Sequence, residues 1–152
     1  MQRLLSAISL LCLFALAPAI NGQTKKRDLK NYAEGPTFEI KTGSWNGSDS
    51  EFERFRQFLW ETWNNKRQVY FKTISWTREG AEIINHYYVE KSGNDSWRIA
   101  IRSEGDCPYS SKKACRELKS TEYIYDQAEK IQTEDKYKII LSRASNKDRS
   151  EY

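Results

Sequence analysis

Apolar residues recur at helical spacing over residues 50–66 and predict one amphipathic helix. Ser50 with Glu53 three residues later forms a capping box that favours a helix start here. Asn64 and Asn65 tolerate the left-handed backbone that ends helices. The apolar side chains cover an arc of about 200° on a helical wheel; they are Phe52, Phe55, Phe58, Leu59, Trp60 and Trp63. So broad an arc predicts a helix that lies on a sheet, with Phe58 and Trp60 at the edges of the contact.

Alternating apolar and polar residues predict strands in the rest of the chain. The three central strands are joined by short turns, the first ending in Gly80, and therefore form an antiparallel meander. Residues 128–135 are long for a hairpin and leave room for a helical turn. The predicted strands are Thr37–Thr42, Gln68–Trp76, Ala81–Glu90, Ser96–Ser103, Lys119–Asp126 and Tyr137–Arg143.

This element order predicts a single α+β domain of two layers, with one main N-terminal helix packed on a four- to five-stranded antiparallel sheet. The domain spans residues 37–143, after a flexible leader at residues 23–36. Residues 144–152 follow the last predicted strand with nothing apolar to bury and are expected to be a disordered tail. The order resembles the cystatin-like or helix-grip arrangement, which implies a scaffold and no function, because unrelated activities share such scaffolds.

Residues 1–22 have the composition of a secretory signal peptide: one early cation at Arg3, an apolar run, and small residues near a cut. Cleavage after Ala19 fits an A-x-A site, and cleavage after Gly22, which we favour, leaves Gln23 first. The apolar run is shorter than the ~20 residues of a spanning helix, so we expect no transmembrane anchor after processing. Cys12 lies in the discarded run. The sequence thus predicts an exported protein, periplasmic or extracellular.

The charge balance gives little support to nucleic-acid binding. The formal net charge of the whole chain is +4, and removal of residues 1–22, whose one charged residue is Arg3, lowers it to +3. The surface is therefore mixed rather than basic, without the cationic stripe that nucleic-acid binders carry. The expected partner is a protein or a saccharide.

Two cysteines remain after processing, Cys107 and Cys115, and an even number in an exported chain predicts a disulfide. Closing so short a loop would stabilise the fold by about 2 to 3 kcal/mol in the chain-entropy model. A redox or metal pair is the alternative, but there is no C-x-x-C spacing and the only histidine, His86, is distant in sequence. The sequence indicates no metal site and no cofactor.

Four short motifs in the middle of the chain suggest a family. They are Phe58-Leu59-Trp60-Glu61-Thr62-Trp63, a strand and turn ending in Glu79-Gly80, Tyr88-Val89-Glu90, and Trp97-Arg98-Ile99. The combination resembles a group of small exported bacterial proteins with an F-L-W-x-x-W helix followed by a strand, an E-G turn and a W-R-I or W-R-V strand. The group is uncharacterised, so the resemblance implies a bacterial exported domain and no activity.

Catalytic motifs are sparse. His86 has no nucleophile elbow such as G-x-S-x-G to serve, and a strand histidine without a catalytic role is the favoured reading. Saccharide hydrolysis needs only two acids beside a groove, and several carboxylates lie on or near the predicted strands. The alternative function is therefore a small hydrolase that acts on an envelope saccharide. These carboxylates are Glu79, Glu82, Glu90, Glu104 and Asp106.

Aromatic residues on the predicted strands are the remaining signal, and they exceed what one helix can cover. On an exposed sheet face such rings could stack on a sugar or accept a peptide; the alternative is ordinary cross-strand pairing. The candidates for ligand binding are Tyr70, Trp76, Tyr88, Tyr123 and Tyr125. We therefore expect a non-catalytic exported binding or envelope-associated module. Protease inhibition in the manner of cystatins has no support, because no Q-x-V-x-G hairpin is found at residues 68–80.

Overall fold

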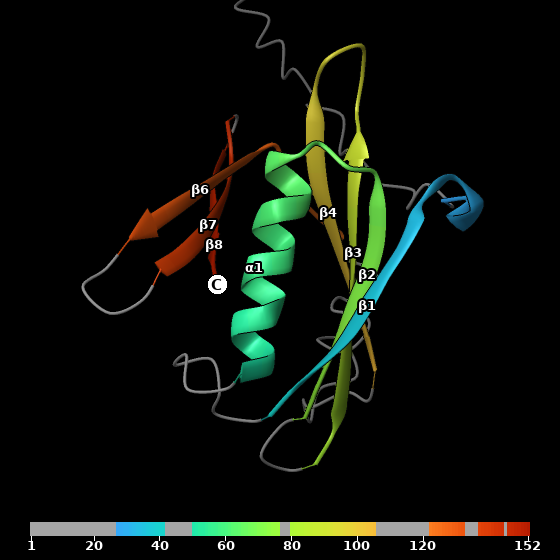
Figure 1. Ribbon diagram of the computed structural model, residues 1–152, viewed down its shortest axis with the longest axis vertical. Helices are drawn as coiled ribbons and strands as arrows, with labels where there is room; N and C mark the ends of the chain where they lie inside the picture. The colour runs from blue at the N-terminus through green and yellow to red at the C-terminus, as the bar shows by residue number, and fades with distance from the viewer. Residues whose placement is uncertain (1–26, 42–49, 77–79, 106–121, 133–136, 145) are drawn as a thin grey trace, which may run out of the picture.

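The computed structural model describes residues 27–41, 50–76, 80–105, 122–132, 137–144 and 146–152 (Figure 1). The described chain contains a short 3-10 helix, one α-helix and eight strands. In order they are η1 (Leu29–Asn31), β1 (Ala33–Ile40), α1 (Ser50–Asn64), β2 (Val69–Trp76), β3 (Glu82–Lys91), β4 (Trp97–Gly105), β5 (Glu122–Tyr125), β6 (Gln127–Gln132), β7 (Tyr137–Arg143) and β8 (Asn146–Glu151).

The α+β class is confirmed, but the main sheet is mixed rather than antiparallel. Its five strands lie in the order β1-β2-β3-β4-β5, and β1 runs parallel to β2 while every other neighbouring pair is antiparallel. The reason is the helix between β1 and β2. Its 15 residues carry the chain back by roughly 22 Å, so that the next strand starts at the same end of the sheet as β1.

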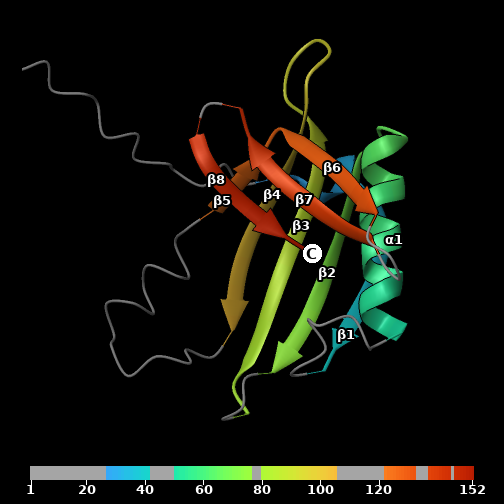
Figure 2. The same ribbon diagram turned by 90° about the vertical axis from the view of Figure 1, so that its left-hand side faces the viewer.

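A second sheet, with strand order β6-β7-β8, lies on the same side of the main sheet as α1 (Figure 2). Ile139 and Leu141 of β7 are fully buried in the core that α1 shares with the main sheet. The inner face of the main sheet is thus covered by α1 over one part and by the second sheet over another. We allowed a helical turn at residues 128–135. The described part of this range, residues 128–132, belongs to strand β6 instead, because β6 pairs with β7 over its whole length.

The core is built around the helix aromatics. Phe55 is fully buried and its ring lies within 6.3 Å of those of Phe71 and Tyr87. Leu59 and Trp63 are buried too, whereas Phe58 and Trp60, at the edges of the predicted contact, are partly buried against the core. The helix ends at Asn64, two residues before the predicted end.

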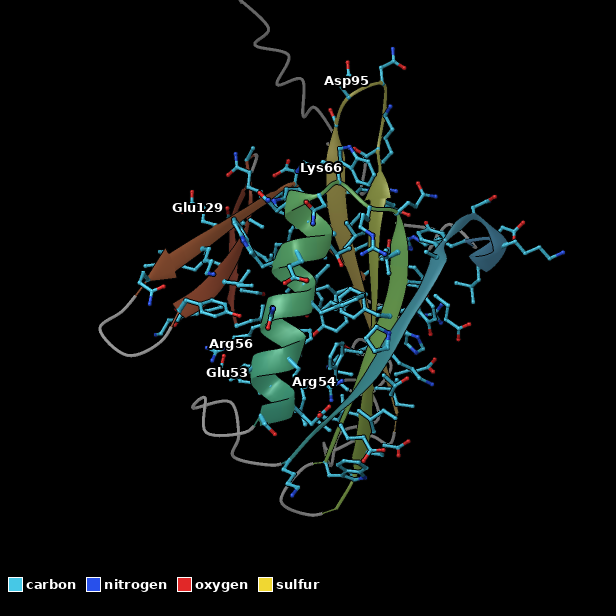
Figure 3. All side chains as sticks on the ribbon, in the orientation of Figure 1. Glu53, Arg54, Arg56, Lys66, Asp95 and Glu129 are labelled. Carbon is cyan, nitrogen blue, oxygen red and sulfur yellow. The ribbon has the colours of Figure 1, made fainter. Side chains whose placement is uncertain are left out.

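Arg56 was not expected in the core, yet it is buried where α1 meets β7. Its guanidinium donates a hydrogen bond of 2.7 Å to the Tyr137 carbonyl and forms an ion pair with Glu53. Figure 3 shows Arg56 and Glu53 together on one side of α1. An arginine can lie there because its guanidinium also packs over the rings of Phe52 and Tyr137.

The leader and the tail differ from the prediction of disorder. From residue 27 onward the leader is ordered: Arg27 is bound by carboxylates of the main sheet, and β1 begins at Ala33. The tail forms β8, and the Tyr152 amide donates to the Ile139 carbonyl at 2.8 Å. Low apolar content predicted fraying, but backbone pairing with β7 and one inserted ring, that of Tyr152, hold this segment in place.

Within the described part of the chain, no helix is both long enough and apolar enough to cross a lipid bilayer.

Candidate functional site

A row of polar side chains crosses the inner face of the main sheet, next to the row formed by Phe71, Tyr87 and Ile101. Thr73 on β2 is the register partner of Asn85 on β3, which in turn faces Ser103 on β4. Ser103 Oγ donates a hydrogen bond of 2.6 Å to Asn85 Oδ1, and Asn85 Nδ2 donates to Thr73 Oγ1 at 3.5 Å. The second distance is at the limit of a hydrogen bond, so the Asn85 amide group is only weakly engaged.

Three tyrosines extend this row toward the second sheet. Tyr87, one rung further along β3, is hydrogen-bonded to Thr73 and to Tyr152. Tyr152 is hydrogen-bonded to Ser150 as well, and the Ser150 hydroxyl also lies within hydrogen-bond distance of the Tyr125 phenol. We call these residues the hydroxyl network: Thr73, Asn85, Ser103, Tyr87, Tyr152, Ser150 and Tyr125.

A cavity of about 340 Å³ opens along the hydroxyl network. It lies over the inner face of β3, β4 and β5, beside the C-terminal strand. Tyr123 also lines it and is the large apolar side chain most open to solvent there, at 46% exposed. The lining residues are Asn85, Tyr87, Ile101, Ser103, Tyr123, Tyr125, Ser150 and Tyr152. We call this cavity the inner-face pocket.

The described lining of the inner-face pocket holds no acidic or basic side chain, and burial keeps the phenols of Tyr87 and Tyr152 neutral. Burial, followed by the neighbouring Tyr152, raises the pKa of Tyr87 well above its usual value. Burial, followed by Tyr125, raises the pKa of Tyr152 to about 12. At neutral pH the pocket therefore offers hydroxyl groups, one amide and aromatic rings, without a formal charge.

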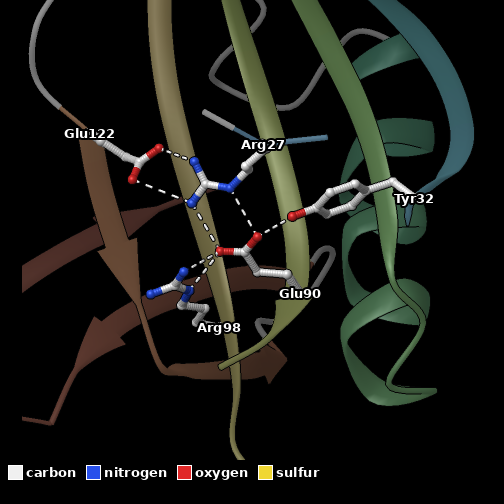
Figure 4. Close-up of polar contacts among 5 residues, drawn as sticks. All are labelled: Arg27, Tyr32, Glu90, Arg98 and Glu122. Atoms are coloured by element: carbon white, nitrogen blue, oxygen red, sulfur yellow. Dashed lines mark hydrogen bonds and ion pairs between the residues drawn. The ribbon is translucent and has the colours of Figure 1, made fainter. Parts of the chain in front are cut away.

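A second group of side chains lies on the outer face of the same sheet and is strongly charged (Figure 4). The Arg27 guanidinium donates to both oxygens of Glu90, at 2.9 Å each, and pairs with Glu122. Arg98 donates to the same Glu90 carboxylate at 2.7 Å, and the Tyr32 phenol donates to it as well. We call these five residues the Arg27 network.

The electrostatics of the Arg27 network hold Glu90 in its ionised form. Burial alone would raise the pKa of the Glu90 carboxyl, but the hydrogen bonds from Arg27 and Tyr32 and the charges of Arg27 and Arg98 outweigh it and lower the pKa to about 2. A carboxyl held as an anion cannot donate a proton near neutral pH, so Glu90 is unsuited to be a general acid. Its role is to bind the leader to β3.

Next to the Arg27 network lie a histidine and two tyrosines. The ring of Tyr70 stacks on that of Tyr88, 5.2 Å between centroids, and its phenol lies 2.8 Å from His86 Nδ1. On the other side of the imidazole, Nε2 is 2.7 Å from Glu104 Oε1, without the alignment of a hydrogen bond. Contacts of this kind between side chains on neighbouring strands are typical of ordinary sheet stabilisation.

The five aromatic residues proposed as ligand-binding do not gather on one surface. Tyr123 and Tyr125 line the inner-face pocket, although Tyr125 is only 4% exposed. Tyr70 and Tyr88 lie on the opposite face, and Trp76 lies at the far end of β2, opposite Glu82. The structure thus divides the set between two faces and one strand end.

Sequence reasoning proposed only Tyr125 of the hydroxyl network and missed its six other members, Thr73, Asn85, Tyr87, Ser103, Ser150 and Tyr152. A signal was present: in three adjacent strands, a polar residue occupies a position that the alternation assigns to the same face as Val69, Val89 and Ile99. The register that joins the three into one row depends on strand pairing, which the sequence alone did not fix.

Those acids considered for hydrolysis that the structure describes do not meet at the pocket. Glu82, Glu90 and Glu104 alternate with the inward residues of their strands and so lie on the outer face. Glu79, Asp106 and the cysteines Cys107 and Cys115 lie outside the described residues. Among the described residues, no three histidine, cysteine, aspartate or glutamate side chains are grouped so as to hold a metal ion.

Comparison of the chain with protein-family models, with curated proteins and with solved structures finds no match.

Proposed function

We propose that this chain is a non-catalytic exported binding module and that the inner-face pocket is its ligand site. The observation that carries the proposal is the hydroxyl network: a sheet face that would otherwise be apolar carries a connected row of hydroxyls and an amide, and a cavity opens along it. A purely structural core would gain more from apolar side chains in these positions, because buried polar groups add stability only when they are fully hydrogen-bonded.

The dimensions of the pocket support this reading. Its volume of about 340 Å³ falls within the roughly 300–1,000 Å³ of small-molecule sites. Such sites combine apolar and aromatic walls with a few placed polar groups, and here Ile101 and Tyr123 supply the walls while Asn85 and Ser103 supply the polar groups.

Binding without reaction is favoured over hydrolysis by where the described acids lie. Glycoside hydrolysis needs two carboxyl groups on either side of the bond to be cleaved. The described acids of β3 and β4 are on the outer face, and the negative charge of Glu90 is paired with Arg27 and Arg98. Hydroxyls and one amide can hold and orient a ligand but do not supply this chemistry.

A pocket-filling variant tests the proposal. We would screen a set of small uncharged polar compounds against the full chain by ligand-observed NMR, and repeat the screen with Ser103→Phe, whose ring would project into the pocket. Lys72→Phe adds the same ring on the outer face of β2 and is the matched control. Compounds should bind the wild type and the control and fail to bind Ser103→Phe, with circular dichroism showing that all three are folded. Equal binding to all three would refute this site.

Export and the Cys107–Cys115 disulfide are part of the proposal and have their own test. The full chain would be produced in a bacterium, fractionated by osmotic shock, and the periplasmic product analysed by mass spectrometry with and without reduction and thiol alkylation. We expect a product that begins at Gln23 or Ile20 and gains two alkyl groups only after reduction. A full-length product in the cytoplasmic fraction would contradict export.

A further inference from the structure

Building on the proposed function of the inner-face pocket, we propose that its ligand is a neutral saccharide unit, an uncharged sugar ring placed against Tyr123 and hydrogen-bonded by Asn85 and the neighbouring hydroxyls.

The absence of charged side chains from the described lining limits the charge of the ligand. A carboxylate, phosphate or ammonium group in the pocket would be removed from water without an ionic partner among these residues, which costs far more than a lost neutral hydrogen bond. The buried phenols of Tyr87 and Tyr152 do not provide the charge, because burial raises the pKa of each. The ligand group that enters is therefore uncharged.

The polar groups of the lining limit how apolar the ligand can be. Asn85 has a well-made bond to Ser103 and a marginal one to Thr73, so its amide N–H is the donor in the row with most capacity left. An apolar ligand would cover Asn85 and Ser103 without replacing their water, and each polar group left unpaired in this way weakens binding. Hydroxyl groups on the ligand can act as donor or acceptor as each partner requires, so a polyhydroxylated ligand fits this lining best.

Tyr123 supplies the third feature. It is paired with Ile101 across β4 and β5 on the inner face, and the residue is 46% exposed, whereas Ile101 and Tyr125 beside it are buried. An aromatic ring presents a flat apolar face with a polar tip. A sugar ring has the same character, with an apolar face of C–H groups and a rim of hydroxyls, so the two surfaces are complementary.

A peptide is less well served by this geometry. Extended peptides bind by adding a strand to a sheet edge, where unpaired backbone groups give the affinity. The pocket opens over the face of β3, β4 and β5, whose facing backbone groups are already paired with each other. Side chains are what a ligand meets here.

The test is a titration of the ¹⁵N-labelled full chain, followed by NMR of backbone amides and of the Asn85 side chain. The probes are three neutral disaccharides (cellobiose, maltose and N,N′-diacetylchitobiose), glucuronic acid as an anionic sugar, and a capped trialanine peptide. We expect saturable shifts at Asn85, Ser103 and Tyr123 with at least one neutral disaccharide, and none there with glucuronic acid or the peptide.

Variants separate the roles of ring and amide. Tyr123→Ala and Asn85→Ala should each weaken disaccharide binding by about tenfold or more, whereas Tyr123→Phe, which keeps the ring, should stay within about twofold of wild type. Tyr70→Ala, on the outer face, should bind as the wild type does. A loss of affinity that is the same for Tyr123→Phe and Tyr123→Ala would contradict the stacking role.

The outcomes also separate this inference from the proposed function. If the peptide or glucuronic acid shifts the pocket residues and no neutral disaccharide does, the pocket binds a ligand but the saccharide inference is overturned. If disaccharides shift only Tyr70 and Tyr88, the site is on the outer face and both statements fail. If neither these probes nor the uncharged compounds of the screen shift a pocket residue, both fail as well.

Discussion

Replacing Glu90 by glutamine should remove a pH-dependent part of the stability of this fold. Glu90 is 6% exposed and receives hydrogen bonds from Arg27, Arg98 and Tyr32. These contacts lower the pKa of its carboxyl from 4.5 to about 2. Glutamine keeps the size of the side chain and removes its charge, so the variant measures the contribution of the ionised carboxylate to stability.

The magnitude follows from this lowered pKa. Each tenfold change in proton affinity is worth about 1.4 kcal/mol, so the contribution of the ionised carboxylate is about 3 kcal/mol. Since the side chain is almost fully buried, solvent screening does not reduce this figure much. A carboxyl whose pKa is lowered on folding stabilises the folded state fully above the unfolded pKa, and this stabilisation is lost as the pH falls through the folded pKa. The window here is from about pH 5 to pH 2.

The assay is urea unfolding of the wild type and Glu90→Gln, followed by tryptophan fluorescence at several pH values from 7 to 2. The free energy of unfolding of the variant should be lower by about 3 kcal/mol at pH 6, and the difference should shrink as the pH approaches 2. Glu129→Gln, at an exposed position of β6, is the control and should show no such convergence. A difference between wild type and Glu90→Gln that stays constant from pH 6 to pH 2 would refute the reasoning.

Three further predictions concern the core. Arg56→Met should lower the free energy of unfolding by roughly 1–3 kcal/mol, because it removes the guanidinium that donates to the partly buried Tyr137 carbonyl. Arg54→Met, on the exposed side of α1, should change the free energy of unfolding by less than about 1 kcal/mol. Urea unfolding at pH 7 measures both. Gly35→Ala should cost roughly 1–3 kcal/mol by the same measurement, because an added Cβ would lie 2.9 Å from the Cβ of Phe71, and an unchanged midpoint would contradict this packing. In an ultraviolet titration of the phenols, Tyr152 should ionise only near pH 12. The stability that its neutral phenol contributes is therefore complete below pH 10 and is lost as the pH rises from 10 to 12. Tyr152→Phe should remove one late-titrating group, and an unchanged high-pH step would count against the burial of Tyr152.

The sequence predicted local structure better than the arrangement of its elements. The helix, the three strands of the meander and β7 are found within a few residues of their predicted ranges, because each carries its own periodicity. The parallel pairing of β1 with β2 and the second sheet were not predicted. Both depend on where the helix returns the chain and on pairing between residues distant in sequence, for which no local pattern gives evidence.

The two ends of the chain also depend on contacts with residues distant in sequence. Composition assigned residues 23–36 and 144–152 to disorder. In the structure, Arg27 between two carboxylates holds the described part of the first segment, residues 27–36. Backbone pairing and the ring of Tyr152 hold residues 146–152 of the second. A single well-placed contact barely changes the composition of a segment. For the same reason Tyr123 and Tyr125 could be proposed as ligand-binding from their residue type, while Asn85 and Ser103 could not.

The Arg27 network and the inner-face pocket are connected through the register of β3. Side chains alternate across a sheet, so a slip of one residue along β3 would turn Asn85 and Tyr87 outward and bring the neighbouring His86 and Tyr88 into the core. Glu90 opposes such a slip, because a shifted register would carry its carboxylate away from Arg27 and Arg98 and into an apolar layer. The charged cluster on the outer face and the buried Tyr87 and Val89 on the inner face therefore favour the same register of β3. The binding site that we propose depends on this register, because its side chains come from β3, β4 and β5.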